Sequence, residues 1–305
     1  MGVAFGHTGF IGMGTESTYG TGVAGAHYFR LIEESLKLEQ SRMFKKMLSS
    51  AVKRRTHKSK RGVGGNFKIA VPYNSFGLIL YHALGAKGVA GVGPYTHTFT
   101  DGPLPTSFSL EVNRDAAAIG GTSAFRYEGC QIQSLKLSNA VEGWLEADIS
   151  VLGEDEAMIA LPTATYPTDN YISWDELTAL TVNGVTIAGS MAELSIENEL
   201  ADSRNKLGSR LRKGLGRKGS LVTGKLELEF EALAQVTLFQ DLSNAPIVMT
   251  WGDGTRSLSF SLTTAYLNSG TPQMKDEGPI MLELGFEGDL DDLTATLVNN
   301  DASYS

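Results

Sequence analysis

The residue types that most often carry out catalysis are few and scattered in this chain. Its histidines are His7, His27, His57, His82 and His97. None of their spacings matches a metal-ligand motif such as HExxH. The single cysteine, Cys130, excludes an intrachain disulfide, and at the end of a predicted strand it is expected to pack as a small apolar residue. We therefore predict no catalytic residue, no metal site and no cofactor.

Three other patterns resemble ligand sites only in part. Asp101-Gly102 and Asp253-Gly254 lack the alternating oxygen ligands of an EF-hand, and both are typical of turns. Gly214-Leu215-Gly216 lacks the full dinucleotide-binding fingerprint. The acids within 289–292 are expected in a solvated tail.

Basic residues are concentrated in two runs that contain no acid, residues 42–61 and 204–218. Together they hold 16 of the 26 lysines and arginines, so the remaining 10 face all 34 acids. The chain contains an internal repeat, which is described below. Each run is expected to be a loop between the first and second strands of one copy of that repeat. Their members are Arg42, Lys45, Lys46, Lys53, Arg54, Arg55, Lys58, Lys60 and Arg61, and Arg204, Lys206, Arg210, Arg212, Lys213, Arg217 and Lys218.

The basic runs have three interpretations. They could dock on acidic surfaces of another subunit, because complementary potentials guide association. They could instead be solvated loops that contact nothing. Nucleic-acid binding is the weakest interpretation, since aromatic residues for base stacking are limited to Phe44 and no nucleic-acid-binding motif accompanies the runs.

Acidic residues alternate with apolar ones in several predicted strands. After Trp144, one face holds Leu145, Ala147, Ile149 and Val151, and the other holds Glu146, Asp148 and Ser150. The same alternation assigns further acids to exposed strand faces, with Lys68 as a cation on the corresponding strand. These acids are Glu227, Glu229, Glu283 and Glu287.

The chain contains an internal repeat. Residues 36–39 match 194–197, residues 63–71 match 222–230, residues 107–110 match 259–262, and residues 143–153 match 278–288. The matches occur in the same order, at offsets of 158, 159, 152 and 135. Two tandem copies of one β-rich domain are the simplest account of this order.

Length and composition agree with two soluble domains. A chain of 305 residues suits two domains of about 150 residues. Its 42% hydrophobic and 20% charged content is that of a globular protein, and no stretch reaches the roughly 20 apolar residues of a membrane helix. Residues 1–14 contain no Lys or Arg and no continuous apolar segment, so we expect no secretory signal.

The predicted fold is α+β and mainly antiparallel β, with two tandem β-sandwich or partial-barrel domains that each contain one short helix. The first domain spans 1–160 and begins with an extended arm, residues 1–25, without a core of its own. Its helix spans 75–84, with a cap at Asn74 or Ser75 and an end at Gly85. The second domain spans 161–305. It includes a hairpin insertion at 171–190, centred on Asn183-Gly184, a helix within 231–242, and an acidic, loosely held tail from 289.

The chain resembles the tail tube, or major tail, proteins of long-tailed bacteriophages. The segments that carry the resemblance are 12–24 (GMGTESTYGTGVA), 34–38 (ESLKL), 61–65 (RGVGG), 95–100 (YTHTFT) and 125–130 (FRYEGC). The resemblance covers nearly the whole chain. It implies a structural virion subunit whose strands join those of neighbouring subunits around a hollow tube.

Further expectations follow from this resemblance. Rings of six domains would stack into the tube, so two domains per chain would give trimers with pseudo-sixfold symmetry. The basic runs would contact neighbouring subunits or rings. The acidic strand faces would line the lumen, where double-stranded DNA passes without specific binding. The partners would be other copies of the chain and other tail proteins, assembled in the host cytoplasm and located in the virion tail.

A binding module is the alternative from another functional class. A two-domain β-sandwich could be a virion decoration or carbohydrate-adhesion protein. Such a module would be expected to gather exposed aromatic residues in one concave site. Trp144, Trp174 and Trp251 are dispersed in the sequence, which favours assembly.

Overall fold

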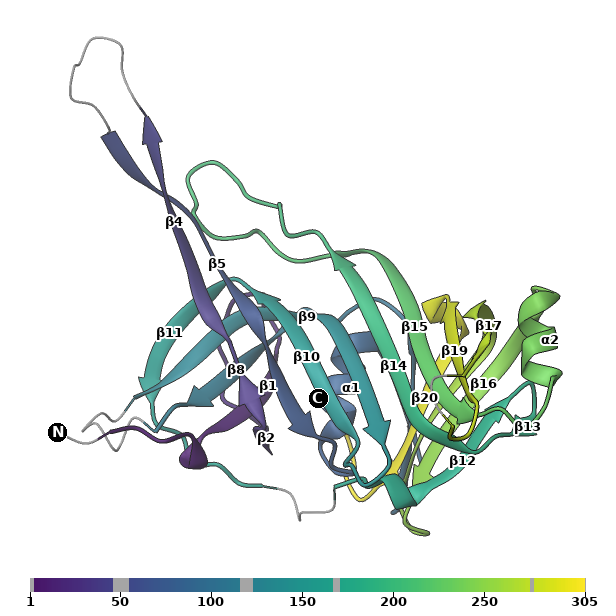
Figure 1. Ribbon diagram of the computed structural model, residues 1–305. Helices are drawn as coiled ribbons and strands as arrows, with labels where there is room; N and C mark the ends of the chain where they lie inside the picture. Colours follow the sequence, from purple (N-terminus) through teal and green to yellow (C-terminus); the bar gives the residue numbers. More distant parts are fainter. Residues whose placement is uncertain (1–2, 46–54, 116–122, 167–170, 275–276, 305) are drawn as a thin grey trace.

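The computed structural model describes residues 3–45, 55–115, 123–166, 171–274 and 277–304 (Figure 1). Strands dominate, and every named strand pair is antiparallel. The described residues include two short α-helices, α1 (Phe76–Leu84) and α2 (Ala234–Gln240). The predicted fold class, mainly antiparallel β with two short helices, is confirmed.

The strands fall into an earlier and a later group along the chain. The earlier strands are β1 (Phe10–Glu16), β2 (His27–Arg30), β3 (Glu33–Glu34), β4 (Lys37–Lys45), β5 (Arg55–Ala70), β6 (Gly85–Ala90), β7 (Tyr95–Asp101), β8 (Ser107–Asn113), β9 (Ser123–Ala140), β10 (Glu146–Gly153) and β11 (Asp155–Ala160). The later strands are β12 (Leu177–Val182), β13 (Val185–Thr186), β14 (Gly189–Leu200), β15 (Arg217–Glu229), β16 (Asn244–Gly252), β17 (Ser257–Ser269), β18 (Pro272–Gln273), β19 (Met281–Gly288) and β20 (Leu293–Asn299). Short 3₁₀ turns occur at Gly6–Thr8, Trp174–Glu176 and Leu290–Asp292.

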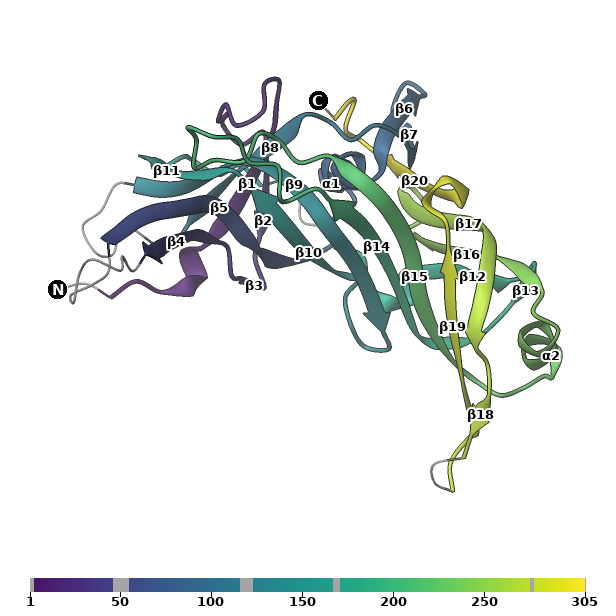
Figure 2. The ribbon, with the colours of Figure 1, turned by 90° about the horizontal axis from the view of Figure 1, so that it is seen from above.

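One continuous sheet, the inner sheet, runs through both halves of the chain. Its strand order is β4–β5–β10–β9–β14–β15–β19, and β19 then pairs with the end of β17 and with β18. Apolar residues alternate along these strands and are buried on one face, as Ala147, Ile149 and Val151 are in β10. Seen from above, the sheet follows an arc with α1 on its convex side (Figure 2).

Outer strands cover the buried face of the inner sheet. In the first half they are β2–β1–β8, followed by the start of β9 and then β11. Strand β9 therefore belongs to both layers, outer at its start and inner at its end. In the second half the order is β12–β16–β17–β20, and β20 also pairs with β7 of the first half.

The pairing pattern of the inner sheet occurs twice. Leu38 lies opposite Val63 in β4–β5, and Ile196 lies opposite Val222 in β14–β15, at offsets of 158 and 159. Strands β9–β10 repeat as β17–β18–β19 at an offset of 135. Even the irregularity repeats, because the pairing skips Gln133 in β9 and Asn268 in β17, which are also 135 residues apart.

Helix α1 lies where it was predicted, but its first residue acts differently. Gly85 ends the helix with a φ of 107°, a conformation that glycine adopts without strain. Ser75 occupies the N-cap position without a side-chain cap bond, because its Oγ lies 2.8 Å from Nδ1 of His27. The hairpin turn at Asn183-Gly184 is also confirmed, with positive φ at both residues.

The prediction of a coreless N-terminal arm is wrong for residues 10–16. They form β1, which pairs with β2 and β8 and buries Ile11 and Met13. The glycines that suggested an irregular segment instead permit close packing. A Cβ on Gly12 would lie 2.6 Å from the Tyr28 ring, and one on Gly14 would lie 2.3 Å from the Ala24 carbonyl oxygen.

The prediction of a loosely held C-terminal tail is also wrong. Strand β20 lies between β17 and β7, and its side chains Leu293, Ala295 and Leu297 are fully buried. Tyr304 is buried as well. Three of the four acids of this segment lie within 289–292, and the strand that follows them alternates apolar residues with threonine. The charge of the first four residues therefore does not describe the rest of the segment.

Candidate functional site

The concave surface of the inner sheet is uncovered and polar, and we call it the open face. Because residues directly opposite in neighbouring strands share a face, one row can be followed across it. The row runs from Lys68 in β5 to Asp148, Lys136, Ser195, Thr223 and Glu287 in β10, β9, β14, β15 and β19. All seven sequence-predicted candidates lie on the open face, namely Glu146, Asp148, Ser150, Glu227, Glu229, Glu283 and Glu287.

Acids outnumber bases on the open face. Its members in β5, β10, β9, β14, β15 and β19 include eight carboxylates and three lysines. The carboxylates are Glu146, Asp148, Glu193, Glu197, Glu227, Glu229, Glu283 and Glu287, and the lysines are Lys68, Lys136 and Lys225. The open-face residues of β9 and β14 were not among the sequence-predicted candidates. Polar and apolar residues nevertheless alternate from Ser134 to Ser138 and from Glu193 to Glu197, as they do in β10.

Each of these three lysines contacts a carboxylate. Lys68 lies 2.5 Å from Glu146, and Lys136 lies 3.0 Å from Glu193. Hydrogen bonding to Glu146 raises the pKa of Lys68. Lys225 lies 2.9 Å from Glu283 and 3.0 Å from Glu227, and these hydrogen bonds raise its pKa. The lysines are therefore neutralised within the sheet, and the surplus charge is negative.

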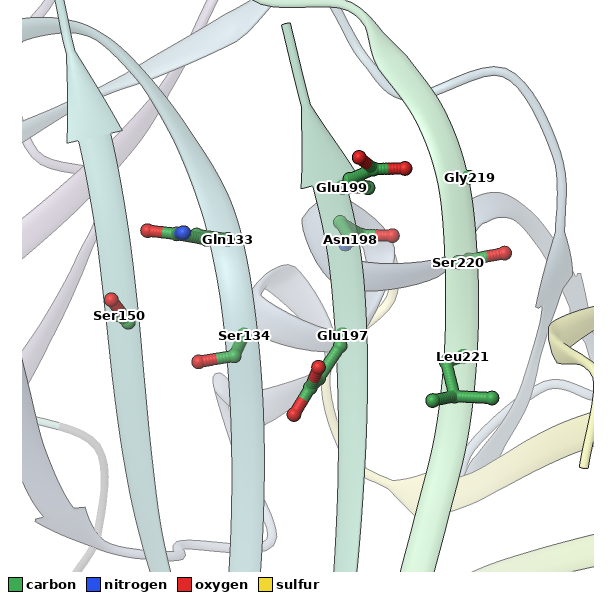
Figure 3. Close-up of a pocket in the computed structure, with 9 residues that line it drawn as sticks. All are labelled: Gln133, Ser134, Ser150, Glu197, Asn198, Glu199, Gly219, Ser220 and Leu221. Carbon is green, nitrogen blue, oxygen red and sulfur yellow. The ribbon is translucent and has the colours of Figure 1, made fainter. Parts of the chain in front are cut away.

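A shallow hollow of about 580 Å³ crosses the middle of the open face (Figure 3). Ser150, Ser134, Glu197 and Leu221 line it from four neighbouring strands. Across the described ranges, no three His, Cys, Asp or Glu side chains are arranged to hold a metal ion. The hollow is thus a wide polar depression of the sheet rather than an enclosed cleft.

The two halves of the inner sheet meet where β9 pairs with β14, a junction that we call the seam. It runs from Ala140 opposite Met191 to Ser134 opposite Glu197. The Val141 amide donates to the Ser190 carbonyl at 3.2 Å, and this bond continues the same register. The seam therefore joins the last inner strand of one half to the first inner strand of the next.

Side chains of the second half secure the seam on the buried side. The Asn198 amide nitrogen donates to the carbonyl oxygens of Ala83 at 2.9 Å and Ile132 at 3.3 Å. Arg217 donates to the Gly102 carbonyl at 2.8 Å and pairs with the Asp101 carboxylate. The end of α1 is therefore covered by residues of β14 and β15.

The sequence matches a family described as phage tail tube protein over residues 6–288. The chain belongs to this family. It is a structural protein of the virion tail, and no curated protein matches it. Within the described ranges, neither helix has the length and apolar character needed to cross a bilayer.

The first basic run of this tail tube protein is a strand ribbon over much of its length, and the prediction of a loop is wrong there. Strands β4 and β5 remain paired out to Lys45 and Arg55, and the ribbon projects beyond the body of the molecule (Figure 1). Arg42, Lys45, Lys58 and Lys60 are exposed on it. Lys46, Lys53 and Arg54 lie outside the described residues.

The second basic run is a loop up to Gly216, and its last two members, Arg217 and Lys218, begin β15. The loop contacts the first half of the same chain. Arg210 Nε donates to the Ser59 carbonyl at 2.7 Å, and Arg212 donates to the Gly153 carbonyl at 2.8 Å. Together with Arg217 at the seam, these side chains are used within the chain. Arg204, Lys206, Lys213 and Lys218 are exposed.

Histidine and cysteine side chains serve packing and hydrogen bonding in the fold. His82 lies 3.1 Å from Thr15 Oγ1, and burial lowers its pKa to about 3. His97 lies 2.8 Å from the Asp301 carbonyl, and burial lowers the pKa of His27. Burial also raises the pKa of the Cys130 thiol, so that the unreactive protonated form is favoured.

The expectation that the three tryptophans are dispersed is wrong for Trp144 and Trp174. The Trp174 amide donates to the Gly143 carbonyl at 3.0 Å, which brings Trp174 next to Trp144. Both side chains are exposed, whereas Trp251 is buried. The cavity beside Trp174 has about 30 Å³, and Trp144 does not line it.

Proposed function

We propose that this tail subunit assembles with copies of itself into stacked rings that form a hollow tube for genome passage. The seam is the observation that carries the proposal. It is a junction between two repeated units, and it uses the last inner strand of one unit and the first inner strand of the next. The same two kinds of edge remain at the ends of the chain's inner sheet, so the junction can recur between chains.

The two remaining edges support closure into a ring. At one end β4 pairs with β5, and at the other end residues 269–273 pair with β19, with no further partner among the described residues. Open sheet edges favour pairing with another chain. Because the two edges differ and every junction has the same geometry, the association is head to tail, and such an interface closes into a ring when the rotation allows.

The proposed ring contains three chains. Each chain carries two tandem tube domains, 1–160 and 161–305, and six such domains per ring give threefold symmetry with a pseudo-sixfold appearance. Rings assemble in the host cytoplasm and join other tail proteins at the ends of the tube. In this arrangement the arc of the inner sheet forms the wall, with its open face towards the centre.

The charge of the open face supports its role as the wall of a DNA conduit. Phosphates are repelled by its surplus carboxylates, whereas lysines that bound phosphate would retain the genome. Lys68, Lys136 and Lys225 are already paired with Glu146, Glu193 and Glu283. Double-stranded DNA therefore passes this surface without being held by it.

The projecting β4–β5 ribbon is suited to contact a neighbouring ring. It carries exposed Arg42 and Lys45 towards its far end, while the rest of the chain is strongly acidic. Complementary potentials of this kind guide and orient association. Raised ionic strength should therefore weaken the stacking of rings more than the pairing of strands within a ring.

Charge reversal on the open face tests genome passage. Glu197 and Glu287 are exposed and form no ion pair among those found in the described residues, so Glu197→Lys and Glu287→Lys add positive charge without breaking a contact. We expect phage with both changes to assemble tails but to release DNA at least tenfold more slowly at low salt. Glu197→Gln with Glu287→Gln is the matched control and should have a smaller effect. Unchanged release from intact tails carrying the lysines would contradict the lumen assignment.

A further inference from the structure

We infer that neighbouring chains join in one fixed register, in which Lys37 of one chain lies opposite Thr271 of the next. This inference rests on the proposed ring assembly and deepens it. The new strand pair would be β4 of one chain with residues 269–273 of its neighbour. In the same register, Leu38 lies opposite Gly270 and Leu36 lies opposite Pro272.

The register follows from the seam within the chain. There, Ser195 lies opposite Lys136. The repeat that relates β14 to β4 has an offset of 158, and the repeat that relates the end of β9 to residues 266–273 has an offset of 135. Ser195 therefore corresponds to Lys37, and Lys136 corresponds to Thr271.

An independent observation at Leu36 supports this register. The Val141 amide donates a hydrogen bond to the Ser190 carbonyl. Because hydrogen-bonded and non-hydrogen-bonded pairs alternate along antiparallel strands, Leu137 and Leu194 also form a hydrogen-bonded pair in the seam. The equivalent pair between chains is Pro272 with Leu36. Proline has no N–H to donate.

The Leu36 carbonyl needs no donor from the neighbouring chain. It already accepts hydrogen bonds from Arg114 Nη2 at 2.6 Å and from the Tyr127 hydroxyl at 3.1 Å. Slipping the strands by two residues keeps the faces but places Pro272 opposite Glu34 or Leu38, and this match is lost. The N–H that Pro272 lacks and the Leu36 carbonyl that needs no further donor therefore favour the same register.

The two helices show which surface the neighbouring chain would cover. In α1, eight of the nine residues are buried, partly because β14 and β15 supply Asn198 and Arg217 at its end. In α2, only Gln235 is buried, and Leu242 just beyond the helix is 80% exposed. By the same offsets, the residues that would reach the end of α2 are Gln40 and Lys58 of the next chain.

Engineered disulfides test the register. Lys37 and Thr271 are both exposed, so Lys37→Cys with Thr271→Cys should not disturb the fold of the subunit. They would form a non-hydrogen-bonded pair, with Cα atoms about 4.5 Å apart, which lies within the range that a disulfide spans. After mild oxidation of assembled protein, we expect more than half of the chains in covalent multimers on a denaturing gel without reductant. The series should end at the number of chains in one ring.

Two double variants are the controls. Ser195→Cys with Lys136→Cys places the same geometry inside one chain, and it should give an oxidised monomer. Lys37→Cys with Gln273→Cys shifts the pair by two residues to about 7–8 Å, and its yield of multimers should be at least tenfold lower. The native Cys130 is buried, so it should not contribute to these products.

The outcomes separate the register from the ring assembly. Rings in the microscope together with efficient 37–271 crosslinking support both. Rings that crosslink better through 37–273 would overturn the register and leave ring assembly standing. A protein that stays monomeric before oxidation, at every concentration, while the internal 195–136 control crosslinks, would overturn the assembly and the register together.

Discussion

Leu137 of β9 and Leu194 of β14 lie directly opposite each other, and both side chains are buried. This pair joins the two repeated units of the tail tube protein into one sheet. In the proposed ring, the junction inside the chain would be a physical template for the junctions between chains. Residues that secure it can be tested in the isolated subunit, whereas their counterparts at the chain ends can be tested only in the assembly.

Arg217 should be a strong contributor to subunit stability. Arg217→Ala removes its bonds to Asp101, the Gly102 carbonyl and Asn198, and it leaves the side-chain oxygen of the buried Asn198 without this donor. We expect a loss of about 2–3 kcal/mol in the free energy of unfolding, measured with urea. The neighbouring Lys218 pairs with Glu199 in an exposed ion pair, so Lys218→Ala should cost under about 0.5 kcal/mol. Equal effects would contradict the role of Arg217 at the seam.

The C-terminal segment should prove essential to folding. Tyr304 is buried beside His97 and Phe99, and its hydroxyl bonds to Asn299 and Asp301. Tyr304→Ala should lower the free energy of unfolding by about 3–5 kcal/mol, because it leaves a cavity and unpaired polar groups. Ser303→Ala changes an exposed neighbour and serves as the control. A thermal midpoint unchanged by Tyr304→Ala would show that the segment is dispensable.

Acid should destabilise the subunit partly through His82. Burial lowers its folded pKa to about 3, whereas an unfolded histidine titrates near 6.5. Below pH 6.5 the unfolded state therefore binds a proton that the folded state refuses, and stability falls as pH falls. Between pH 7 and pH 5.5 this contributes on the order of 1 kcal/mol. His82→Gln should remove that part of the pH dependence, while the exposed His57→Gln should leave it intact. Parallel pH profiles for wild type and His82→Gln would contradict a neutral buried histidine.

Leu242 should matter for assembly and not for folding. It is 80% exposed beside α2, on the surface that the next chain would cover. Leu242→Glu should weaken ring formation at least tenfold, measured by sedimentation, because the buried carboxylate would lose hydration that a pair with Lys58 of the next chain offsets only in part. Leu207 is fully exposed at the tip of the basic loop, so Leu207→Glu is the matched control. Both variants should unfold within about 0.5 kcal/mol of wild type. Normal rings from Leu242→Glu would place this surface outside the interface.

Period-two patterns allowed much of the inner sheet to be predicted. Ala147, Ile149 and Val151 are buried as their alternation indicates, and Glu146 and Asp148 lie on the open face. The predicted acids converge because direct cross-strand pairs share a face. The convergence depends on the register of the strands. Register places Glu227 opposite Glu283, which is 56 residues further along the chain, and no local sequence pattern specifies it.

Other features depended on long-range contacts. Gly12 and Gly14 suggested an irregular arm, but the space that they leave is filled by Tyr28 and by the Ala24 carbonyl. The β4–β5 ribbon contains a basic run whose composition is typical of a loop, yet its strands pair out to Lys45. In both places the partner strand, rather than local composition, decides the structure.

Electron microscopy of the purified full-length protein tests the central claim most directly. We expect hollow rings, stacked into tubes at high concentration, in which the inner sheet continues from residues 269–273 of one chain to β4 of the next around a central bore. The open face with Glu197 and Glu287 should line that bore. A protein that remains monomeric at all concentrations, or rings with the open face directed outward, would contradict the account.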